Sequence, residues 1–501
     1  MTAIERFLPN ERATELFGDD VAAALRAGDV VALKGDLGAG KTTLARAIIR
    51  ALAGDPRLDV PSPTFTLLQT YDARIPVAHF DLYRLGSPDE LDELGFAEQS
   101  AEGVALIEWP ERAGERLSGE VVEIELTHQD EGRLARISGS EAILARIGRS
   151  LEARDFLELS DWSSAYRTHL AGDASARSYE IVEAEGTPAA ILMNSPPLVL
   201  GPPVRGDKAY AEIAHTARTV SAFVAVDRLL HEAGFAVPRI YAQDLDKGFL
   251  VIEDLGSSNF LGPRGEPVAE RYETAAELLA KLHLRRWPSQ AEAAPGVTHL
   301  IPPFDRGATM IEAELLLEWY VPATSGRKAS DAEREGFEEV WGRALDRLAD
   351  TETTLMLRDV QSPNFIWREE RIGLDRIGLI DFQDALIGPS AYDVASLAMD
   401  ARVTIPEELE RRTVEAYARA RRTAGSFDRA AFDEAYAVMA AQRNSKILGI
   451  FVRLHRRDGK PGYLKHLPRI RAYLRRALKH PALAEMREFY ERHGFLEERA
   501  V

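Results

Sequence analysis

The pattern of apolar and polar positions predicts alternating strands and helices over the first third of the chain. Short apolar runs at 30–33, 77–81 and 104–108 are typical of buried strands, and the last two each close on a carboxylate. Apolar residues recur at helical spacing over 44–52, and Gly54 is placed to end that helix. Strands that alternate with helices predict an α/β domain with a largely parallel sheet.

The pattern changes after a helical stretch. Residues 139–160 have partly periodic apolar positions and no long tract of Gly, Pro or Ser, so we expect a short, ordered connection there. Two strands around a turn follow at 175–182 and 189–193, and a third at 249–256 runs into an expected hinge. Helical patterns then dominate, at 269–284, 309–320 and 331–350. We therefore predict a small β-rich lobe followed by a larger helical lobe, an α+β arrangement.

Length and composition narrow the class of protein. The 501 residues suffice for about three folding units, and 45% hydrophobic residues can fill several cores. No cysteine occurs, which excludes disulfides, thiolate zinc sites and a cysteine nucleophile. The net charge of -18 disfavours direct binding of nucleic acid. Because the N-terminus has no signal pattern and no apolar run approaches the roughly 18 residues of a membrane span, we predict a cytoplasmic protein without a membrane partner.

One segment departs from the acidic balance. Basic residues crowd together between Arg453 and Lys479, and Leu467, Ile470 and Leu474 recur there at helical spacing. This combination predicts the solvated face of an amphipathic helix. A site for an anion or a partner is the alternative.

A glycine-rich segment follows the first predicted strand. Residues 35–42 are Gly-Asp-Leu-Gly-Ala-Gly-Lys-Thr, which fits the P-loop pattern. The amides of such a loop and the N-terminus of the next helix converge on nucleotide phosphates, Lys41 neutralises their charge, and the Thr42 hydroxyl can bind Mg²⁺. The predicted nucleotide-binding residues here are Gly35, Asp36, Gly38, Ala39, Gly40, Lys41, Thr42 and Thr43.

Two carboxylates complete this predicted site. Asp81 and Glu108 each end an apolar run, and in a parallel sheet the ligand crevice lies at the carboxyl ends of the strands. Acids placed there beside a P-loop handle Mg²⁺ or water. We therefore predict metal-site roles for Thr42, Asp81 and Glu108, with Glu108 also a catalytic candidate.

These motifs resemble the TsaE family, formerly YjeE. The resemblance is carried by 35–43, by Pro-Ser-Pro-Thr-Phe-Thr at 61–66, by His-Phe-Asp-Leu-Tyr-Arg at 79–84 and by Ile-Glu-Trp-Pro-Glu at 107–111. It implies a compact P-loop ATPase that supports threonylcarbamoyladenosine modification of tRNA through the TsaD and TsaB complex. It also implies that Thr64 lies in a switch-like segment, that Asp81 assists the metal and that Glu108 positions water.

A second phosphate-handling motif lies in the C-terminal half. Asp359 precedes Asn364 by five residues, and Asp381 follows at the end of an apolar strand, which is the spacing of a kinase catalytic loop and its metal-binding aspartate. Phosphoryl transfer needs alignment and charge neutralisation more than covalent chemistry. Asp359 is therefore predicted to orient or deprotonate the acceptor hydroxyl, and Asn364 and Asp381 to bind Mg²⁺ beside ATP.

This half resembles the aminoglycoside phosphotransferase superfamily and, within it, the AmgK family of anomeric N-acetylmuramate and N-acetylglucosamine kinases. The stretches that carry it are 173–179, 192–197, 358–364 and 380–393, and the resemblance covers about 155 to 480. It implies a protein-kinase-like fold and ATP-dependent phosphorylation of an amino sugar at C1, in cell-wall recycling.

Departures from the kinase pattern keep alternatives open. Met193 occupies the strand position of a phosphate-binding lysine, and a methionine cannot donate to phosphate. Arg177 on the adjacent segment is predicted to supply that charge, because an arginine fork matches phosphate geometry. The C-terminal half is alternatively an aminoglycoside or other small-alcohol kinase, or a non-catalytic nucleotide-binding docking module.

The whole chain is thus predicted to be a bifunctional fusion. We expect a TsaE-like ATPase domain at 1–147, a linker at 148–158 and a kinase-like phosphotransferase domain at 159–501, its small lobe at about 159–256 and its large lobe at about 257–501. The expected partners are ATP, Mg²⁺, the TsaD and TsaB complex and an amino sugar.

Overall fold

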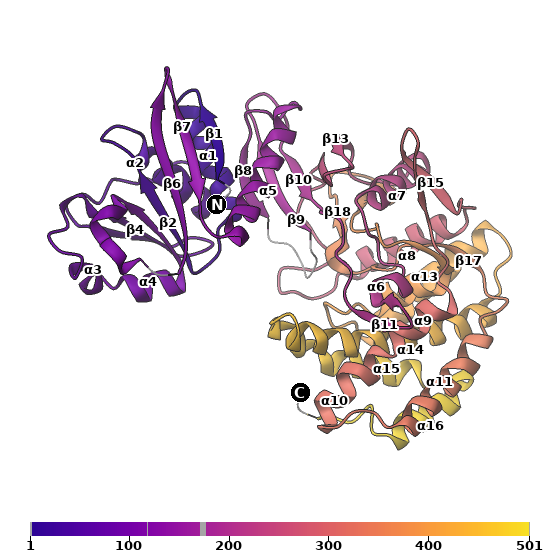
Figure 1. The fold of residues 1–501 in the computed structure, drawn as a ribbon. Coiled ribbons are helices and arrows are strands. Elements are labelled where there is room, and N and C mark those ends of the chain that lie inside the picture. The colour runs from indigo at the N-terminus through magenta and orange to yellow at the C-terminus, as the bar shows by residue number, and fades with distance from the viewer. Residues whose placement is uncertain (1–2, 118, 171–176, 500–501) are drawn as a thin grey trace. The chain divides into compact units, whose positions relative to one another are not determined.

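A computed structural model describes residues 3–117, 119–170 and 177–499 of the chain (Figure 1). The chain forms two compact units. The first contains residues 1–195 together with 241–253, and the second contains 196–240 together with 254–501. The domain boundaries at 147 and 159 stay a prediction, since this division follows packing rather than sequence motifs.

A seven-stranded sheet builds the first part of the N-terminal unit. Its order is β1-β7-β6-β2-β5-β4-β3, in which β6, β2, β5 and β4 run parallel and the outer pairs are antiparallel. The central strand β2 carries an unbroken buried run, as expected for a strand covered on both faces. The strands are β1 (Ile4–Leu8), β2 (Asp29–Lys34), β3 (Leu68–Tyr71), β4 (Val77–Asp81), β5 (Val104–Glu108), β6 (Glu120–Gln129) and β7 (Gly132–Ser138).

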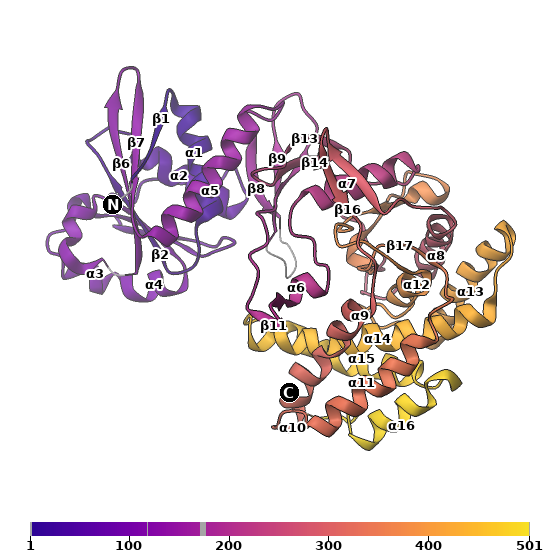
Figure 2. The ribbon, with the colours of Figure 1, turned by 45° about the vertical axis from the view of Figure 1, so that its right-hand side comes forward.

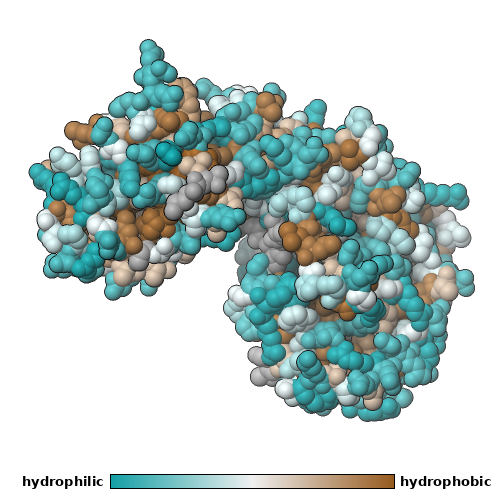
Figure 3. All heavy atoms as spheres, in the orientation of Figure 1, coloured by the Kyte–Doolittle hydropathy of each residue, from teal (hydrophilic) through white to brown (hydrophobic). Residues whose placement is uncertain are grey.

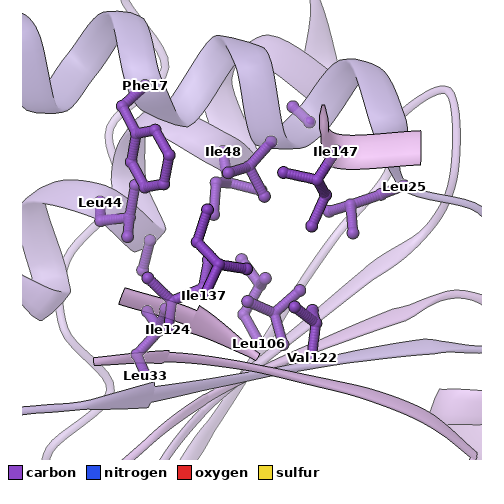
Figure 4. Packing of buried hydrophobic residues seen from close by; sticks show 14 of the residues in the cluster. Phe17, Leu25, Leu33, Leu44, Ile48, Leu106, Val122, Ile124, Ile137 and Ile147 are labelled. Carbon is purple, nitrogen blue, oxygen red and sulfur yellow. The ribbon is translucent and has the colours of Figure 1, made fainter. Parts of the chain in front are cut away.

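Helices α1 (Glu11–Ala24), α2 (Lys41–Ala53) and α5 (Glu141–Glu158) cover one face of this sheet. Figure 4 shows Phe17, Ile48 and Ile147 from these helices above sheet residues that include Leu106 and Ile137. A second cluster, which includes Phe80 and Phe96, lies around the short helices α3 (Glu90–Glu93) and α4 (Phe96–Glu102). Gly54 caps α2 in the left-handed conformation, with φ 65°, which confirms the predicted helix end.

A five-stranded antiparallel sheet, in the order β13-β14-β10-β9-β8, completes the N-terminal unit. Helix α5 serves both sheets without a break. Its first half contributes Ile147 and Leu151 to the core of the seven-stranded sheet, and its second half contributes Phe156 and Leu157 to the core of the five-stranded sheet. The strands are β8 (Tyr166–Leu170), β9 (Ser178–Glu183), β10 (Ala190–Asn194), β13 (Ile240–Asp244) and β14 (Phe249–Glu253).

Buried charges join the same two parts. Asp20 of α1 accepts hydrogen bonds from Arg154 of α5 at 3.0 Å and from Arg167 of β8 at 2.8 Å, and all three side chains are buried. Arg167 also donates to both oxygens of Glu180 in β9, at 2.7 and 2.9 Å. Because each ion has a partner of opposite charge, burial of the group is compensated.

The C-terminal unit is mainly helical. The long helix α14 runs beside α12 and α15, as Figures 1 and 2 show. Its helices are α6 (Tyr210–Ile213), α7 (Ser221–Glu232), α8 (Ala269–His283), α9 (Arg306–Ala313), α10 (Val321–Ser325), α11 (Asp331–Asp346), α12 (Ser390–Ala398), α13 (Glu407–Ala424), α14 (Arg429–Arg456), α15 (Leu467–Ala477) and α16 (Ala484–Arg492).

Four two-stranded sheets lie among these helices, and two of them carry the kinase-type motif. The pairs are β11 (Pro203–Arg205) with β12 (Lys208–Ala209), β15 (Gln290–Ala294) with β16 (Val297–Leu300), β17 (Thr353–Met356) with β20 (Leu386–Pro389), and β18 (Phe365–Trp367) with β19 (Ile377–Leu379). The candidate catalytic loop connects β17 to β18, and the candidate metal-binding segment follows β19.

Most predicted elements are present, with two differences. The strand predicted at 175–182 is β9, which begins at Ser178; residues 175 and 176 lie outside the described residues. The helix predicted at 309–320 instead ends at Ala313 and continues as a π-helical turn, Leu316–Tyr320. A Cβ on Gly449 of α14 would lie 2.2 Å from the carbonyl carbon of Leu315, so the π turn occurs where α14 makes its closest approach.

The surface agrees with the composition. On the face in Figure 3 hydrophilic residues predominate and apolar residues lie in small scattered groups. In the described part of the chain, no helix combines the length and apolar character needed to cross a membrane.

Candidate active sites

The P-loop segment connects β2 to α2 through backbone that favours glycine. Gly35, Gly38 and Gly40 have φ of 137°, 79° and 104°. A Cβ on Gly35 would lie 2.4 Å from the carbonyl oxygen of Leu126, so a larger residue would displace the loop. The eight predicted nucleotide-binding residues therefore lie along one continuous stretch of chain: Gly35, Asp36, Gly38, Ala39 and Gly40 lie in the loop, and Lys41, Thr42 and Thr43 form the first turn of α2.

Lys41 lies at the first position of α2. Its Nζ donates to the carbonyl oxygens of Gly35 and Asp36 at 2.7 and 2.9 Å and lies 3.8 Å from the centre of the Trp109 ring. Burial lowers the pKa of this lysine, and the nearby Glu108 opposes the change. The ammonium group is thus held over the loop, where a phosphate would meet it.

Asp81 and Glu108 are neighbours at the carboxyl ends of β4 and β5, where the strand register pairs them directly. Thr42 Oγ1 donates to Glu108 Oε2 at 2.8 Å, and His79 Nε2 lies 3.1 Å from Glu108 Oε1. Both oxygens of this buried carboxylate are therefore engaged. Asp81 Oδ2 accepts from the hydroxyls of Ser62 and Thr64, each at 2.8 Å.

Sequence reasoning missed two residues of this site. His79 is fully buried beside Glu108, and Arg133 of β7 donates from Nε to the Ala39 carbonyl oxygen at 2.8 Å. In the sequence, His79 is only the first residue of the motif at 79–84, and nothing there indicates a contact with Glu108. Arg133 had no local signal, because β7 reaches the loop through strand pairing rather than chain proximity. Trp109 also has a role beyond packing, since it faces the lysine ammonium.

The kinase-type residues meet in the C-terminal unit. Asn364 Nδ2 donates to the Asp359 carbonyl oxygen at 2.8 Å and to Asp381 Oδ2 at 3.3 Å. Gln383 Nε2 donates to Asp381 Oδ1 at 2.9 Å. The structure therefore brings together the three residues predicted from spacing, and Gln383, two residues after Asp381, contacts the candidate metal-binding carboxylate from its other side.

A buried aspartate holds the catalytic loop. Asp393 of α12 is fully buried and accepts from the backbone N–H of Leu357 at 2.7 Å and of Arg358 at 2.9 Å. Arg358 and Asp381 both have left-handed backbone, with φ of 71° and 62°. Such conformations cost about 1–3 kcal/mol each in a residue other than glycine and gather at functional sites. Asp393 thus supports the loop rather than facing it with a free carboxylate.

The candidate phosphate-binding residues of the five-stranded sheet belong to the N-terminal unit. Met193 is buried in β10 opposite Leu250, so the strand offers an apolar side chain at this position. Arg177 immediately precedes β9. Residues 173–176 of the resembling stretch lie outside the described residues. The role of Arg177 stays a prediction.

Two polar residues near the π-helical turn, and the basic segment, take part in packing and ion pairing. Glu314 pairs with Arg205 at 2.5 Å, and Tyr320 is buried and receives a hydrogen bond from Arg471 at 3.3 Å. The basic segment contains α15, in which Arg476 pairs with Glu410 at 2.9 Å. The apolar residues Leu467, Ile470 and Leu474 are buried, as expected for an amphipathic helix, whereas Arg471 is buried and Arg476 is largely buried, so these two basic residues do not lie on a solvated face.

The oxygen-rich residues of both sites suit Mg²⁺. Among the described residues, no group of three or more His, Cys, Asp and Glu side chains is arranged to hold a metal ion. Mg²⁺ is usually bound by one or two carboxylates together with substrate phosphates and water rather than by an all-protein cage. Asp381 with Asn364, and Thr42 with Asp81 and Glu108, fit that pattern.

Two sites of different design thus define the chain as a P-loop nucleotide-binding domain joined to a phosphotransferase. Comparison with known families agrees. Residues 8–136 match the model described as threonylcarbamoyl adenosine biosynthesis protein TsaE, and residues 167–434 match the phosphotransferase enzyme family. The chain belongs to the phosphotransferase enzyme family and carries a TsaE-family domain in its N-terminal part. Both parts are enzymes, as predicted.

Individual relatives divide in the same way. A segment is 32% identical over 355 residues to the N-acetylmuramate/N-acetylglucosamine kinase of Caulobacter vibrioides, covering 69% of this chain and 96% of that protein. Another is 42% identical over 127 residues to the tRNA threonylcarbamoyladenosine biosynthesis protein TsaE of Rickettsia felis, covering 25% of this chain and 74% of that protein. A solved choline/ethanolamine kinase family protein from Mesorhizobium loti is 15% identical, with a TM-score of 0.43, and covers 68% of this chain and 98% of that one. The predicted fusion and fold class are confirmed.

Proposed function

We propose that the C-terminal half phosphorylates N-acetylmuramate and N-acetylglucosamine at C1, using ATP and Mg²⁺. The observation that carries this proposal is the contact of Asn364 with both the Asp359 loop and Asp381, in a chain that resembles amino-sugar kinases over nearly the whole length of one relative. Phosphoryl transfer requires the acceptor-orienting carboxylate and the metal-binding residues to lie close together, and here they do.

The chemistry follows from the residue types. Mg²⁺ bound at Asp381 and Asn364 would neutralise charge on the phosphates of ATP. Asp359 orients the C1 hydroxyl and accepts its proton as the new oxygen–phosphorus bond forms and the bond from the γ-phosphorus to the β-phosphate oxygen breaks. A hemiacetal hydroxyl is more acidic than an ordinary alcohol, so a weak base such as the Asp359 carboxylate is sufficient to accept its proton. Products of this reaction would enter cell-wall recycling.

Mass spectrometry of products tests the substrate. Wild-type protein is incubated with ATP and, separately, N-acetylmuramate, N-acetylglucosamine and an aminoglycoside. We expect a monophosphate of each amino sugar that no longer reduces copper reagents, because phosphorylation at C1 blocks the reducing end. Asp359→Asn should abolish it, whereas Asp346→Asn, a surface change, should not. Phosphate on the aminoglycoside alone would replace the substrate proposal, and ATP binding without any transfer would favour the docking module.

We further propose that the N-terminal part is a cytoplasmic ATPase that supports threonylcarbamoyladenosine modification of tRNA through the TsaD and TsaB complex. Support comes from the P-loop geometry, the paired Asp81 and Glu108, and the TsaE family match. The net charge of -18 agrees with action through a partner rather than on tRNA directly. Mg²⁺ is assigned to Thr42, Asp81 and Glu108.

Exposed apolar residues suit this partner. Leu37 of the P-loop is 83% exposed, and Phe65, next to Thr64, is 84% exposed. Large apolar side chains this exposed, beside the nucleotide-binding loop and beside Thr64, are candidates for contact with another protein. The test is a steady-state ATPase assay in which the purified TsaD and TsaB proteins are added. We expect them to stimulate ATP hydrolysis by wild type, Phe65→Ala to reduce this stimulation, and Lys41→Ala to abolish ATP hydrolysis. Asp359→Asn serves as the matched control and should leave stimulation unchanged. Equal stimulation of Phe65→Ala and wild type would remove Phe65 from the contact.

A further inference from the structure

Arg358, the residue before the candidate catalytic aspartate, is held in an unfavourable backbone conformation. Its φ is 71°, and the next residue, Asp359, donates its N–H to the carbonyl oxygen of Leu357 at 2.9 Å. Asp393 fixes the backbone N–H groups of Leu357 and Arg358. These contacts restrain the backbone of Arg358 but not its long side chain. Contacts of the side chain are therefore a second possible restraint on the left-handed conformation.

The Arg358 side chain is anchored by a buried carboxylate. Its Nη2 donates to Glu312 Oε1 of α9 and, at 3.0 Å, to the carbonyl oxygen of Ala214. Lys446 Nζ of α14 lies 2.6 Å from the same Glu312 oxygen, and Gln442 Nε2 donates to the other oxygen at 3.1 Å. Glu312 is completely buried. One carboxylate thus joins the catalytic loop to two helices that lie far away in the sequence.

The charges in this cluster are unequal. Two cations, Arg358 and Lys446, face the single anion Glu312. Burial alone would raise the pKa of Glu312, but the two cations lower it to about 2. Asp359 also acts electrostatically on both cations, and Asp384 acts on Arg358, so the catalytic-loop carboxylate is one of the negative charges that these cations face. Lys446 is therefore linked to Asp359 both through Glu312 and Arg358 and directly by its charge.

We infer that Glu312 and Lys446 are positioning residues for phosphoryl transfer. They hold Arg358 in its left-handed conformation and thereby aim the Asp359 carboxylate at the acceptor hydroxyl. Neither residue has to touch the sugar or ATP, because both act through Arg358. This inference rests on the kinase activity proposed above, and it goes beyond the three residues that the kinase spacing identifies.

Lys446→Met tests the inference, since it keeps about the length and the apolar stem of the side chain and removes the ammonium group, which contacts Glu312 and, at 3.4 Å, the Tyr392 hydroxyl. A 1 Å displacement of a catalytic group can cost about 10²-fold in rate. We expect kcat for the amino sugar to fall by about that factor while KM for ATP and for the sugar changes less than about threefold. Lys446→Arg should restore part of kcat. Lys41→Ala is included in every protein, so that the P-loop domain contributes no ATP turnover.

Arg476→Met is the matched control. It removes the cation of a largely buried pair, Arg476 with Glu410, which lie 2.9 Å apart in the same unit but on α15 and α13. Both variants lose a buried charge partner, and thermal unfolding measures that shared cost. Only Lys446→Met should lower kcat. Equal effects of the two variants on kcat would overturn the inference and leave Lys446 as a purely structural residue.

Hydrogen exchange gives a readout that does not depend on the substrate. The N–H groups of Leu357 and Arg358 are bonded to Asp393, so a peptide that contains them should be protected in wild type. Lys446→Met and Glu312→Gln should speed its exchange at least tenfold, and Arg476→Met should not. Unchanged exchange of this peptide in both Lys446→Met and Glu312→Gln would refute the positioning role of the two residues. Inactivity of wild type on every sugar would remove the proposed substrates but would leave this measurement decisive.

Discussion

Replacing Asp20 by Asn should destabilise the P-loop part and the five-stranded sheet of the N-terminal unit together. Asp20 is 2% exposed and is the carboxylate that Arg154 and Arg167 share. Without it, the two buried guanidinium groups keep two acidic neighbours: Glu180, which pairs with Arg167, and Asp19, whose carboxyl group interacts electrostatically with both arginines. Removal of one partner from a buried ion pair costs about 3–5 kcal/mol, because the other charge stays buried without compensation. We expect a loss in that range.

Native-state hydrogen exchange is the suitable assay, because a chain with several compact parts has no single two-state free energy of unfolding. The free energy of opening is measured for peptides from α1 and from β8 and β9. Both should fall by about 3–5 kcal/mol in Asp20→Asn, since the cluster and helix α5 serve both cores. Peptides of α14, in the other unit, report on general damage and should be unchanged.

Asp155→Asn provides the control. Asp155 pairs with Arg6 at 2.5 Å, but the two side chains are 47% and 27% exposed, and exposed pairs are worth only about 0–1 kcal/mol. If Asp20→Asn lowers the free energy of opening no more than this control does, the buried charge cluster does not stabilise the two parts together. A loss confined to α1 would show that the two parts unfold independently.

Three further outcomes are expected. Burial, followed by the charge of Asp20, raises the pKa of Asp19 from 3.8 to about 7. Between these two pH values the folded protein retains a proton that the unfolded chain has released, so the stability of the fold falls as pH rises from 3.8 to about 7. Asp19→Asn should therefore gain up to about 4 kcal/mol over wild type at pH 8 and less at pH 5 in the free energy of opening of an α1 peptide, measured by native-state hydrogen exchange; an equal gain at both pH values would contradict the assignment. Gly35→Ala should abolish nucleotide binding at the P-loop, because its Cβ would meet the Leu126 carbonyl oxygen at 2.4 Å. The measurement is a titration with a fluorescent ATP analogue on the Asp381→Asn background, which removes the candidate metal-binding carboxylate of the other nucleotide site; unchanged affinity would mean that the loop adapts. Gln383→Ala should raise the Mg²⁺ concentration needed for half-maximal sugar phosphorylation by about tenfold, since the amide fixes a metal-site carboxylate; an unchanged Mg²⁺ titration would refute that role.

Local sequence was enough to predict the parts of each site that lie close together in the chain. The glycines and Lys41 of the P-loop are placed by one strand, one turn and one helix, and their geometry follows from that local order. Asn364 likewise reaches the Asp359 carbonyl oxygen because both belong to one short loop. Asp81 and Glu108 could be paired from the rule that parallel strands end at the same edge of a sheet.

What the sequence by itself determined is therefore the fusion of two enzyme families and the candidate residues of the two sites, because these depend on residue types at short spacing. Tertiary structure alone decided which buried charges meet: Asp20 with Arg167, and Glu312 with Arg358 and Lys446. A charged residue in a helical pattern is ordinarily assigned to the solvated face, and its own neighbours in sequence carry no sign that it is buried. Only the packing of elements more than forty residues apart removes water from such a side chain and supplies the partner that makes its burial tolerable.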